Sequence, residues 1–114
     1  MESLIRQYVA GWIDGDAAAI IATLADDCTI IESHGPTYHG TEEVKRWVDE
    51  WNGNGSKVEK WDITSFHEMP PDGAVFEWHF ECTVDGKKHS LDGISIAQFK
   101  GGKISYMREY RAVK

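Results

Sequence analysis

The sequence predicts an α+β fold in which helices come first and a mostly antiparallel sheet follows. In the first half, apolar residues recur at the spacing of amphipathic helices. In the second half, β-branched and aromatic runs are separated by the turn sequences PPDG (70–73), DG (85–86) and KGG (100–102). Asp-Gly between β-rich runs is a strong hairpin signal. Because helices and strands are segregated along the chain, the class is α+β.

The first half predicts three helices and one strand. Leu4 to Ile13 form one apolar stripe that ends at Gly15, and Asp16 is placed to cap a second, alanine-rich helix. The run CTIIES (28–33) then reads as a strand. Thr41 is the expected N-cap of a third helix, whose first turn is acidic and whose apolar face ends near residues 52–53.

The second half predicts strands over residues 57–69, 74–84, 87–99 and 103–113. Since side chains alternate between the two faces of a strand, Phe76 and Trp78 belong to the face that packs on the helices, and Glu77 to the opposite face. The same alternation places Met107 and Glu109 opposite Ile104. The outer face of the last two strands is too apolar to remain in water, so we expect a homodimer through it. Its expected contact residues are Ile94, Ile96, Tyr106 and Tyr110.

Composition limits the possible partners. The chain has 114 residues, which predicts a single domain spanning 1–114, and 41% hydrophobic with 27% charged residues is typical of globular proteins. The net charge of −7 argues against nucleic-acid binding, which needs a positive surface. No apolar run approaches the roughly 20 residues of a membrane span, and the first residues do not resemble a signal peptide. We therefore expect a cytoplasmic protein without membrane or nucleic-acid partners.

A pocket is expected on the inner face of the sheet. Ser95 and Ala97 are small residues among large aromatic ones, and such a gap leaves space for a small, largely apolar molecule. The residues expected to line the pocket are Trp12, His34, Trp47, Phe76, Trp78, Phe80, Ala97, Phe99, Met107 and Glu109. For two of these a simpler role is open: His34 as a surface imidazole, and Glu109 as the ion-pair partner of Arg111.

Glu32 follows Ile30 and Ile31 at the end of the first strand. An acid in this position is either a solvated strand end or a carboxylate held where water is scarce. In the second case its charged form is disfavoured, so the pKa rises toward the range of a general base. We favour the second interpretation. His34 and His39 near Glu32 lack the spacing of a metal site, so no metal is expected.

Three segments of the chain resemble a known family. They are RQYVAGWIDGDAAAIIATLADDCTIIESHGPTYHG, GTEEVKRWV and GISIAQFKGGKISYMREY. Together they are similar, over essentially the whole chain, to the SnoaL-like and ketosteroid-isomerase-like branch of the nuclear transport factor 2-like superfamily. The resemblance implies a cone-shaped α+β barrel, in which a strongly curved, mixed but mostly antiparallel sheet wraps around the N-terminal helices and leaves a central pocket.

The resemblance also implies roles for three catalytic residues. Tyr8 falls where ketosteroid isomerases carry the tyrosine that donates a hydrogen bond to the enolate oxygen. Glu32 matches their catalytic aspartate, which moves a proton between carbons. Ser95 stands where those enzymes have a protonated aspartate as the second oxyanion donor. This chain departs from the family pattern at two of these positions. Glu32 is longer than aspartate by one methylene group, and the Ser95 hydroxyl is a weaker hydrogen-bond donor than a carboxylic acid.

The function expected from these residues is general acid–base chemistry next to a carbonyl: isomerisation, cyclisation or dehydration. Glu32 would be the base, Tyr8 the electrophilic donor and Ser95 a helper, with no cofactor. Two other classes stay open, because fold does not fix function. One is a non-catalytic small-molecule binding or sensing module, and the other is a dimeric interaction domain whose cavity is incidental.

Overall fold

The computed structural model describes residues 1–113. Within this range the chain forms three helices and six strands in the order α1 (Glu2–Asp14), α2 (Ala17–Ala22), β1 (Leu24–Ile31), β2 (Thr37–His39), α3 (Gly40–Gly53), β3 (Lys57–Met69), β4 (Gly73–Val84), β5 (Lys87–Lys100) and β6 (Lys103–Arg111). None of these helices is long and apolar enough to cross a membrane.

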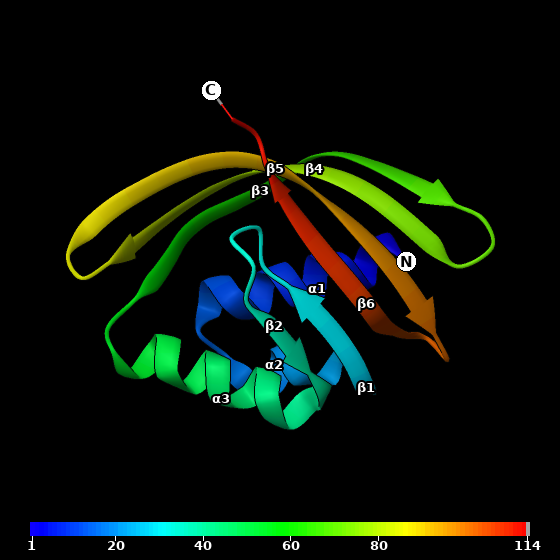
Figure 1. The fold of residues 1–114 in the computed structure, drawn as a ribbon, viewed down its shortest axis with the longest axis horizontal. Helices are drawn as coiled ribbons and strands as arrows, with labels where there is room; N and C mark the ends of the chain where they lie inside the picture. Colours follow the sequence, from blue (N-terminus) through cyan, green and yellow to red (C-terminus); the bar gives the residue numbers. More distant parts are fainter. Residues whose placement is uncertain (114) are drawn as a thin grey trace.

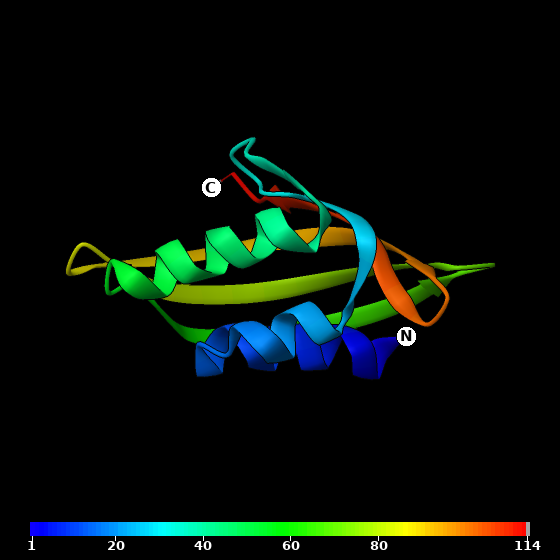
Figure 2. The same cartoon turned by 90° about the horizontal axis from the view of Figure 1, so that it is seen from below.

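The six strands form one curved sheet in the order β2-β1-β6-β5-β4-β3. All neighbours are antiparallel except β1 and β6, which run parallel with Ile30 opposite Met107. The sheet arches over the three helices, which all lie on its concave side (Figures 1 and 2). The predicted α+β class, with a strongly curved, mixed sheet around N-terminal helices, is confirmed.

The N-terminal helices begin and end largely as the sequence predicts. Asp16 Oδ1 accepts the Ala19 N–H at 3.1 Å, and Gly15 ends α1 in the left-handed conformation with φ 66°. Gly11 lets α2 lie close against α1, because a β-carbon there would sit 2.7 Å from the Ile20 side chain. These short contacts fix the two helices as one unit beneath the sheet.

The start of α3 differs from the prediction. His39 rather than Thr41 is the N-cap residue, and the Glu43 carboxylate accepts the His39 N–H at 3.0 Å. The sequence pattern did not indicate a strand before this helix, but residues 37–39 form β2, which pairs with residues 29–31 of β1. The chain passes directly from this strand into the helix, so the N-cap lies two residues earlier than predicted.

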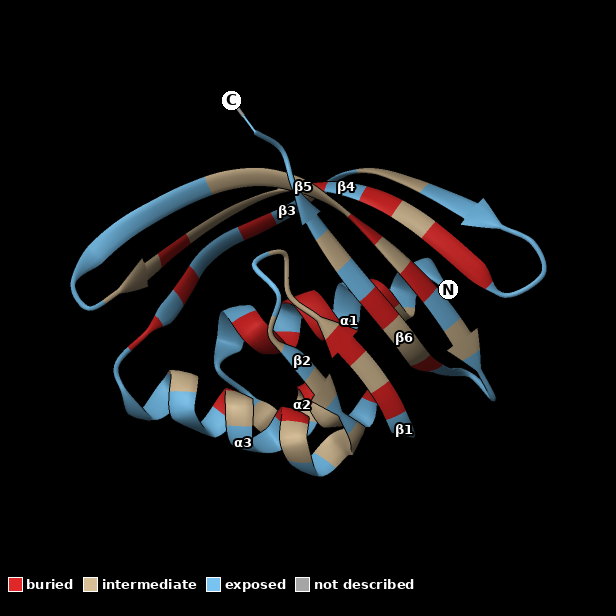
Figure 3. Ribbon diagram, in the orientation of Figure 1, coloured by how far each residue is buried: buried red, intermediate tan, exposed pale blue. Residues whose placement is uncertain are grey.

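The core lies between the helices and the concave face of the sheet (Figure 3). The assignment of Ile104 to the outer face is wrong, since this residue is completely buried. A bulge explains the error: Gln98 pairs with Tyr106 but Phe99 pairs with Ile104, so Ser105 is an extra residue in β6. Side-chain alternation counted back from Met107 therefore fails at this point.

Candidate functional site

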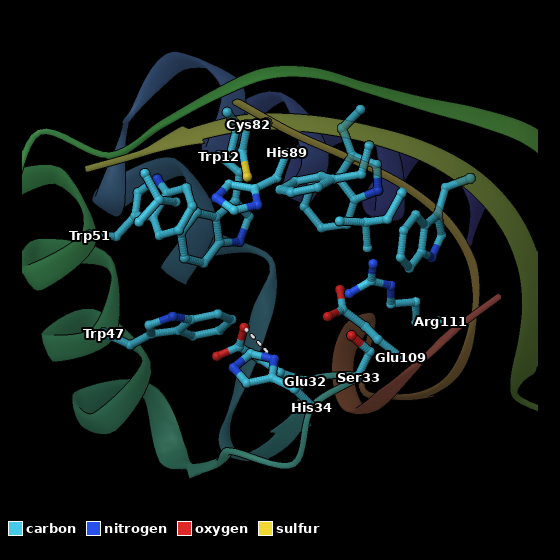
Figure 4. A pocket seen from close by; sticks show the side chains of 16 residues that line it. Trp12, Glu32, Ser33, His34, Trp47, Trp51, Cys82, His89, Glu109 and Arg111 are labelled. Carbon is cyan, nitrogen blue, oxygen red and sulfur yellow. Dashed lines mark ion pairs between the residues drawn. The ribbon is translucent and has the colours of Figure 1, made fainter. Parts of the chain in front are cut away.

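A cavity of about 610 Å³ opens on the concave side of the sheet, which is a typical volume for a small-molecule site (Figure 4). It is bounded by α1 and α3, by the turn after β1, and by strands β3 to β6. Its lining residues are Trp12, Glu32, Ser33, His34, Trp47, Trp51, Val58, Trp61, Trp78, Phe80, Cys82, Val84, His89, Leu91, Glu109 and Arg111.

All five tryptophans of the chain line this cavity. Those on the helices are close together, with ring centroids 4.6 Å apart for Trp12 and Trp47 and 6.2 Å apart for Trp12 and Trp51. The two on the sheet, Trp61 and Trp78, lie 6.2 Å apart with edge-to-face geometry. The cavity thus has a helix wall (Trp12, Trp47, Trp51) and a sheet wall (Trp61, Trp78, with Phe80).

The Trp78 ring is held from behind by β5. Its Nε1 donates a hydrogen bond of 2.9 Å to the Ser95 hydroxyl, which is fully buried. The ring also occupies the space over Gly93, where any β-carbon would collide with it and with the Tyr110 carbonyl. Ser95 and Gly93 therefore position part of the sheet wall, and neither is among the residues that line the cavity.

Glu32 follows β1 and projects into the cavity beside Trp47 (Figure 4). Its Oε1 accepts a 2.7 Å hydrogen bond from the Tyr38 hydroxyl, and its Oε2 lies 3.9 Å from His34 Nδ1. Tyr38 in turn stacks on Trp47 with ring centroids 4.1 Å apart. The unpredicted strand β2 supplies Tyr38, so the orientation of Glu32 depends on an element that the sequence pattern did not indicate.

Burial raises the pKa of Glu32 above its ordinary value. The Tyr38 hydrogen bond and the nearby His34 act in the opposite direction, because both favour the carboxylate. The side chain is 20% exposed, so it is only partly desolvated. The carboxylate of Glu32 is therefore less stabilised by water than that of a surface acid, which makes it a stronger base.

Glu109 lies on β6 at the opposite side of the cavity from Trp47 (Figure 4). Burial, and then the negative charge of Glu32, raise its pKa to about 8. No ion pair joins Glu109 to Arg111 in the structure, although both line the cavity. At neutral pH Glu109 is therefore mainly a neutral carboxylic acid, which can donate a hydrogen bond or a proton.

Tyr8 is buried in α1 behind the tryptophans. Its ring makes edge contacts with Trp12 and Trp61 at centroid distances of 6.4 and 6.1 Å, and it is not among the residues that line the cavity. Burial, followed by the charge of Glu109, raises the pKa of its hydroxyl. Tyr8 is thus close enough to Glu109 to sense its charge, although the cavity surface is formed by other side chains.

The structure gathers about half of the residues expected at the site around the cavity. Those that line it are Trp12, Glu32, His34, Trp47, Trp78, Phe80 and Glu109. Those placed in the surrounding core instead are Tyr8, Phe76, Ser95, Ala97, Phe99 and Met107. The small residues Ser95 and Ala97 do not open a gap, since both are completely buried. Ser95 accepts a hydrogen bond from the Trp78 indole.

The sequence pattern did not predict several of the lining residues, among them Val58 and Trp61 on β3. Both point to the same face although they are three positions apart, because the pairing of β3 with β4 shifts between Val58 and Lys60. Trp51 carried a usable signal, since it continues the apolar stripe of α3. Arg111 and His89 lie near strand ends, where no periodic pattern marks them.

Residues 1–113 contain no group of three or more His, Cys, Asp or Glu side chains arranged to hold a metal ion. The chemistry available to these side chains is instead that of two carboxyl groups in an aromatic cavity. One, Glu32, accepts a hydrogen bond from a tyrosine hydroxyl, which favours its carboxylate form, while the other, Glu109, has a pKa raised to about 8.

A curved sheet around N-terminal helices, with an internal pocket, defines a cone-shaped α+β protein of the ketosteroid isomerase-like type. More narrowly, the sequence profile of the SnoaL-like domain matches residues 5–107, so the chain belongs to the SnoaL-like family of the nuclear transport factor 2-like superfamily. Among curated proteins, no sequence matches the chain.

Solved structures with the same fold agree with this assignment. A protein of ketosteroid isomerase-like fold from Catenulispora acidiphila DSM 44928, in complex with trimethylamine, superposes with a TM-score of 0.84 at 18% identity, covering 96% of this chain and 85% of that one. TerC co-crystallised with polyporic acid gives 0.79 at 19% identity, with coverages of 96% and 89%. A putative polyketide cyclase from Xanthomonas campestris pv. campestris gives 0.77 at 18% identity, with coverages of 96% and 87%.

Proposed function

We propose that the protein is a cofactor-free acid–base enzyme that binds a small, largely apolar carbonyl compound and moves a proton next to its carbonyl group. The observation that carries this proposal is the pair of carboxyl groups in one aromatic cavity: burial raises the pKa of both, but Glu32 accepts a tyrosine hydrogen bond that favours its carboxylate, whereas the charge of Glu32 raises the pKa of Glu109 further. Such a pair provides a base and an acid at the same pH. The family membership and the polyketide cyclase neighbour are consistent with isomerase or cyclase chemistry.

Each residue of the pair has a defined part in the proposed step. Glu32 takes a proton from the carbon next to the carbonyl, and the electron pair of that C–H bond moves toward the carbonyl oxygen. Glu109, in its protonated form, donates to that oxygen and so neutralises the developing negative charge. If the enolate is conjugated with a carbon–carbon double bond, its electron pair takes the proton from Glu32 at the far carbon while the carbonyl re-forms and Glu109 recovers its proton, which completes an isomerisation. Tyr38 positions Glu32 through its 2.7 Å hydrogen bond.

The test is hydrogen–deuterium exchange of 1-tetralone in D₂O, followed by proton NMR. We expect the protein to accelerate exchange at the carbon next to the carbonyl, and Glu32→Gln to lower the accelerated rate by about 10²- to 10⁴-fold, the usual size of a general-base contribution. Glu68→Gln, an exposed glutamate on β3, is the matched control and should keep the full rate.

A second function is favoured by one observation: Tyr8 and Ser95, which match the oxyanion donors of ketosteroid isomerases, do not line the cavity. A non-catalytic binding module would have this arrangement. If ketones shift the NMR signals of the cavity residues but exchange no faster than in buffer, the binding module replaces the enzyme. The neighbours that hold trimethylamine and polyporic acid support small-molecule binding in either case.

The proposal includes a homodimer through the outer face of the sheet. Ile94, Ile96 and Tyr106 are partly exposed there, and Tyr110 is 41% exposed. His79 lies on the same face between Asp92 and Glu81, at 2.6 and 2.7 Å, so the contact surface would be mixed rather than purely apolar. Light scattering should give twice the chain mass, and Ile96→Lys should halve it.

A further inference from the structure

We propose that the natural ligand carries a substituted ammonium group, which the cavity holds between its tryptophan walls and its two carboxyl groups. The inference deepens the proposed function and depends on it only in one respect, namely that this cavity is the ligand site. It does not require Glu32 to act as a base. Three features of the cavity support it.

The first feature is the concentration of indole rings. The helix wall and the sheet wall together contain every tryptophan of the chain, and Phe80 lies 5.3 Å from Trp61. Tryptophan has the most electron-rich ring face among side chains and attracts organic cations more strongly than phenylalanine or tyrosine does. Aliphatic residues would line a purely apolar cavity equally well, so the choice of indoles on both walls favours a charged guest.

The second feature is that, within residues 1–113, neither carboxyl group of the cavity forms an ion pair with a lysine or an arginine. Glu32 has one oxygen bonded to Tyr38, while its other oxygen has only His34 at 3.9 Å, a partner that is mostly exposed. Glu109 forms no ion pair with any other residue of 1–113, and the charge of Glu32 disfavours its ionisation. A neutral apolar ligand would leave this repulsion in place, whereas a cation between the two groups would relieve it.

The third feature is the position of the positive side chains. Within residues 1–113 no lysine lines the cavity, and the arginine that does, Arg111 near the end of β6, extends toward Glu109 in Figure 4 without forming an ion pair with it. His34 and His89 are also exposed. In Figure 4 Trp47 and Trp51 face Glu109 across the open centre, with Glu32 between them. A cation in that centre would have indole rings on one side and carboxyl oxygens on the other.

This arrangement links binding to protonation. Because an ammonium group favours the ionised form of Glu109, binding should release a proton from that residue at pH values below its pKa of about 8. Affinity for a quaternary ammonium, which has no proton of its own to lose, should therefore rise with pH until Glu109 is ionised in the free protein. The other groups that face Glu109 are Glu32, Tyr8 and Arg111.

The test compares two probes of the same shape, phenyltrimethylammonium and tert-butylbenzene, which differ only in having a charged nitrogen or a neutral carbon. Tryptophan fluorescence reports binding directly, since every tryptophan lies at the cavity. At pH 8.5 we expect the cation to bind at least about tenfold more tightly than the neutral probe. Calorimetry in buffers of different ionisation enthalpy, at pH 7, should show release of a proton on cation binding.

Glu109→Gln should abolish the proton release and reduce the preference for the cation to about threefold or less, while Glu68→Gln should leave both unchanged. Equal or tighter binding of tert-butylbenzene by the original protein would overturn the inference but leave the apolar pocket of the proposed function intact. If neither probe binds, both the ammonium inference and the assignment of this cavity as the ligand site are overturned. Cation binding without ketone exchange would remove only the enzymatic part of the proposed function.

Discussion

The space beneath the curved sheet has two halves that use side chains in opposite ways. The closed half is filled by residues that are at most 1% exposed, including Ile5, Ile30, Phe76, Ile104 and Met107. The open half is walled by indole rings around a cavity of about 610 Å³ that also contains two carboxyl groups. Both halves face the same sheet and the same helices.

The difference shows where this protein gives up stability. Aliphatic side chains can adjust their rotamers and fill the space between them. Rigid indole rings that are held by their neighbours cannot, so they keep a cavity open. Within residues 1–113, the buried side-chain polar atoms without a hydrogen-bond partner are the indole nitrogens of Trp12 and Trp61, both in the open half. Unsatisfied donors and repelling acids are costly, and they are concentrated where a ligand would bind.

The largest loss of stability is expected from truncating a side chain in the closed half. Phe76→Ala should lower the free energy of unfolding by about 3–5 kcal/mol, because the ring is buried and its neighbours on the sheet cannot collapse into the gap. Urea denaturation followed by circular dichroism measures this. Trp51→Ala, on the partly exposed helix wall, should cost clearly less. Equal losses at the two positions would contradict the division into a filled and an open half.

The support behind the sheet wall is tested by Gly93→Ala. The added methyl group collides with the Trp78 ring and the Tyr110 carbonyl, so the indole must move and the strand must shift. We expect a loss of about 1–3 kcal/mol, typical of overpacking, together with a changed tryptophan emission spectrum. Gly53→Ala is the matched control: its β-carbon would meet no atom within 4 Å, and the variant should be close to neutral.

The electrostatic cost of the open half is tested by Glu109→Gln. The pKa of Glu109 is raised from 4.5 to about 8 in the folded protein, so the folded state retains a proton that the unfolded state has lost. The stabilisation from this proton is present below pH 4.5 and is lost as the pH rises through 8. Glutamine removes the dependence, and at pH 9 it should stabilise the protein by on the order of 2 kcal/mol.

Thermal unfolding of the original protein and of the Glu109→Gln variant between pH 5 and pH 9 measures this difference in stability. The same ionisation sets the upper limit of the proposed activity, which should fall as Glu109 loses its proton near pH 8. A stability difference that does not change with pH would mean that Glu109 is solvated, and the open half would then lack its neutral acid.

The smallest effect is expected for Tyr38→Phe. The variant keeps the ring stacked on Trp47 but removes the 2.7 Å hydrogen bond to Glu32, which favours the carboxylate. The pKa of Glu32 should rise further, and the low-pH limit of the proposed activity should move to higher pH. Carbon-detected NMR titration of Glu32 measures the shift directly. Tyr106→Phe, on the outer face, should leave the titration unchanged.

The fold was predictable because it follows from local signals. Apolar spacing marked the helices, Asp16 marked a cap, and the Asp-Gly and Gly-Gly turns marked the hairpins. The failures have one physical origin, which is irregular strand geometry. The bulge at Ser105 reversed the alternation at Ile104, the register shift after Val58 hid Trp61, and the short strand β2 had too few residues to show a period.

The sequence by itself determined which aromatic and acidic residues are available to the site: five tryptophans, an acid after the first strand and another on the last. Tertiary structure decided what these residues do. It placed Ser95 against the Trp78 indole, it brought Tyr38 to Glu32, and within residues 1–113 it left Glu109 without an ion pair. Alternation along a strand can say which face a residue occupies. The ionisation of a carboxyl group depends on burial and on charges contributed by distant segments, and these exist only after the chain has folded.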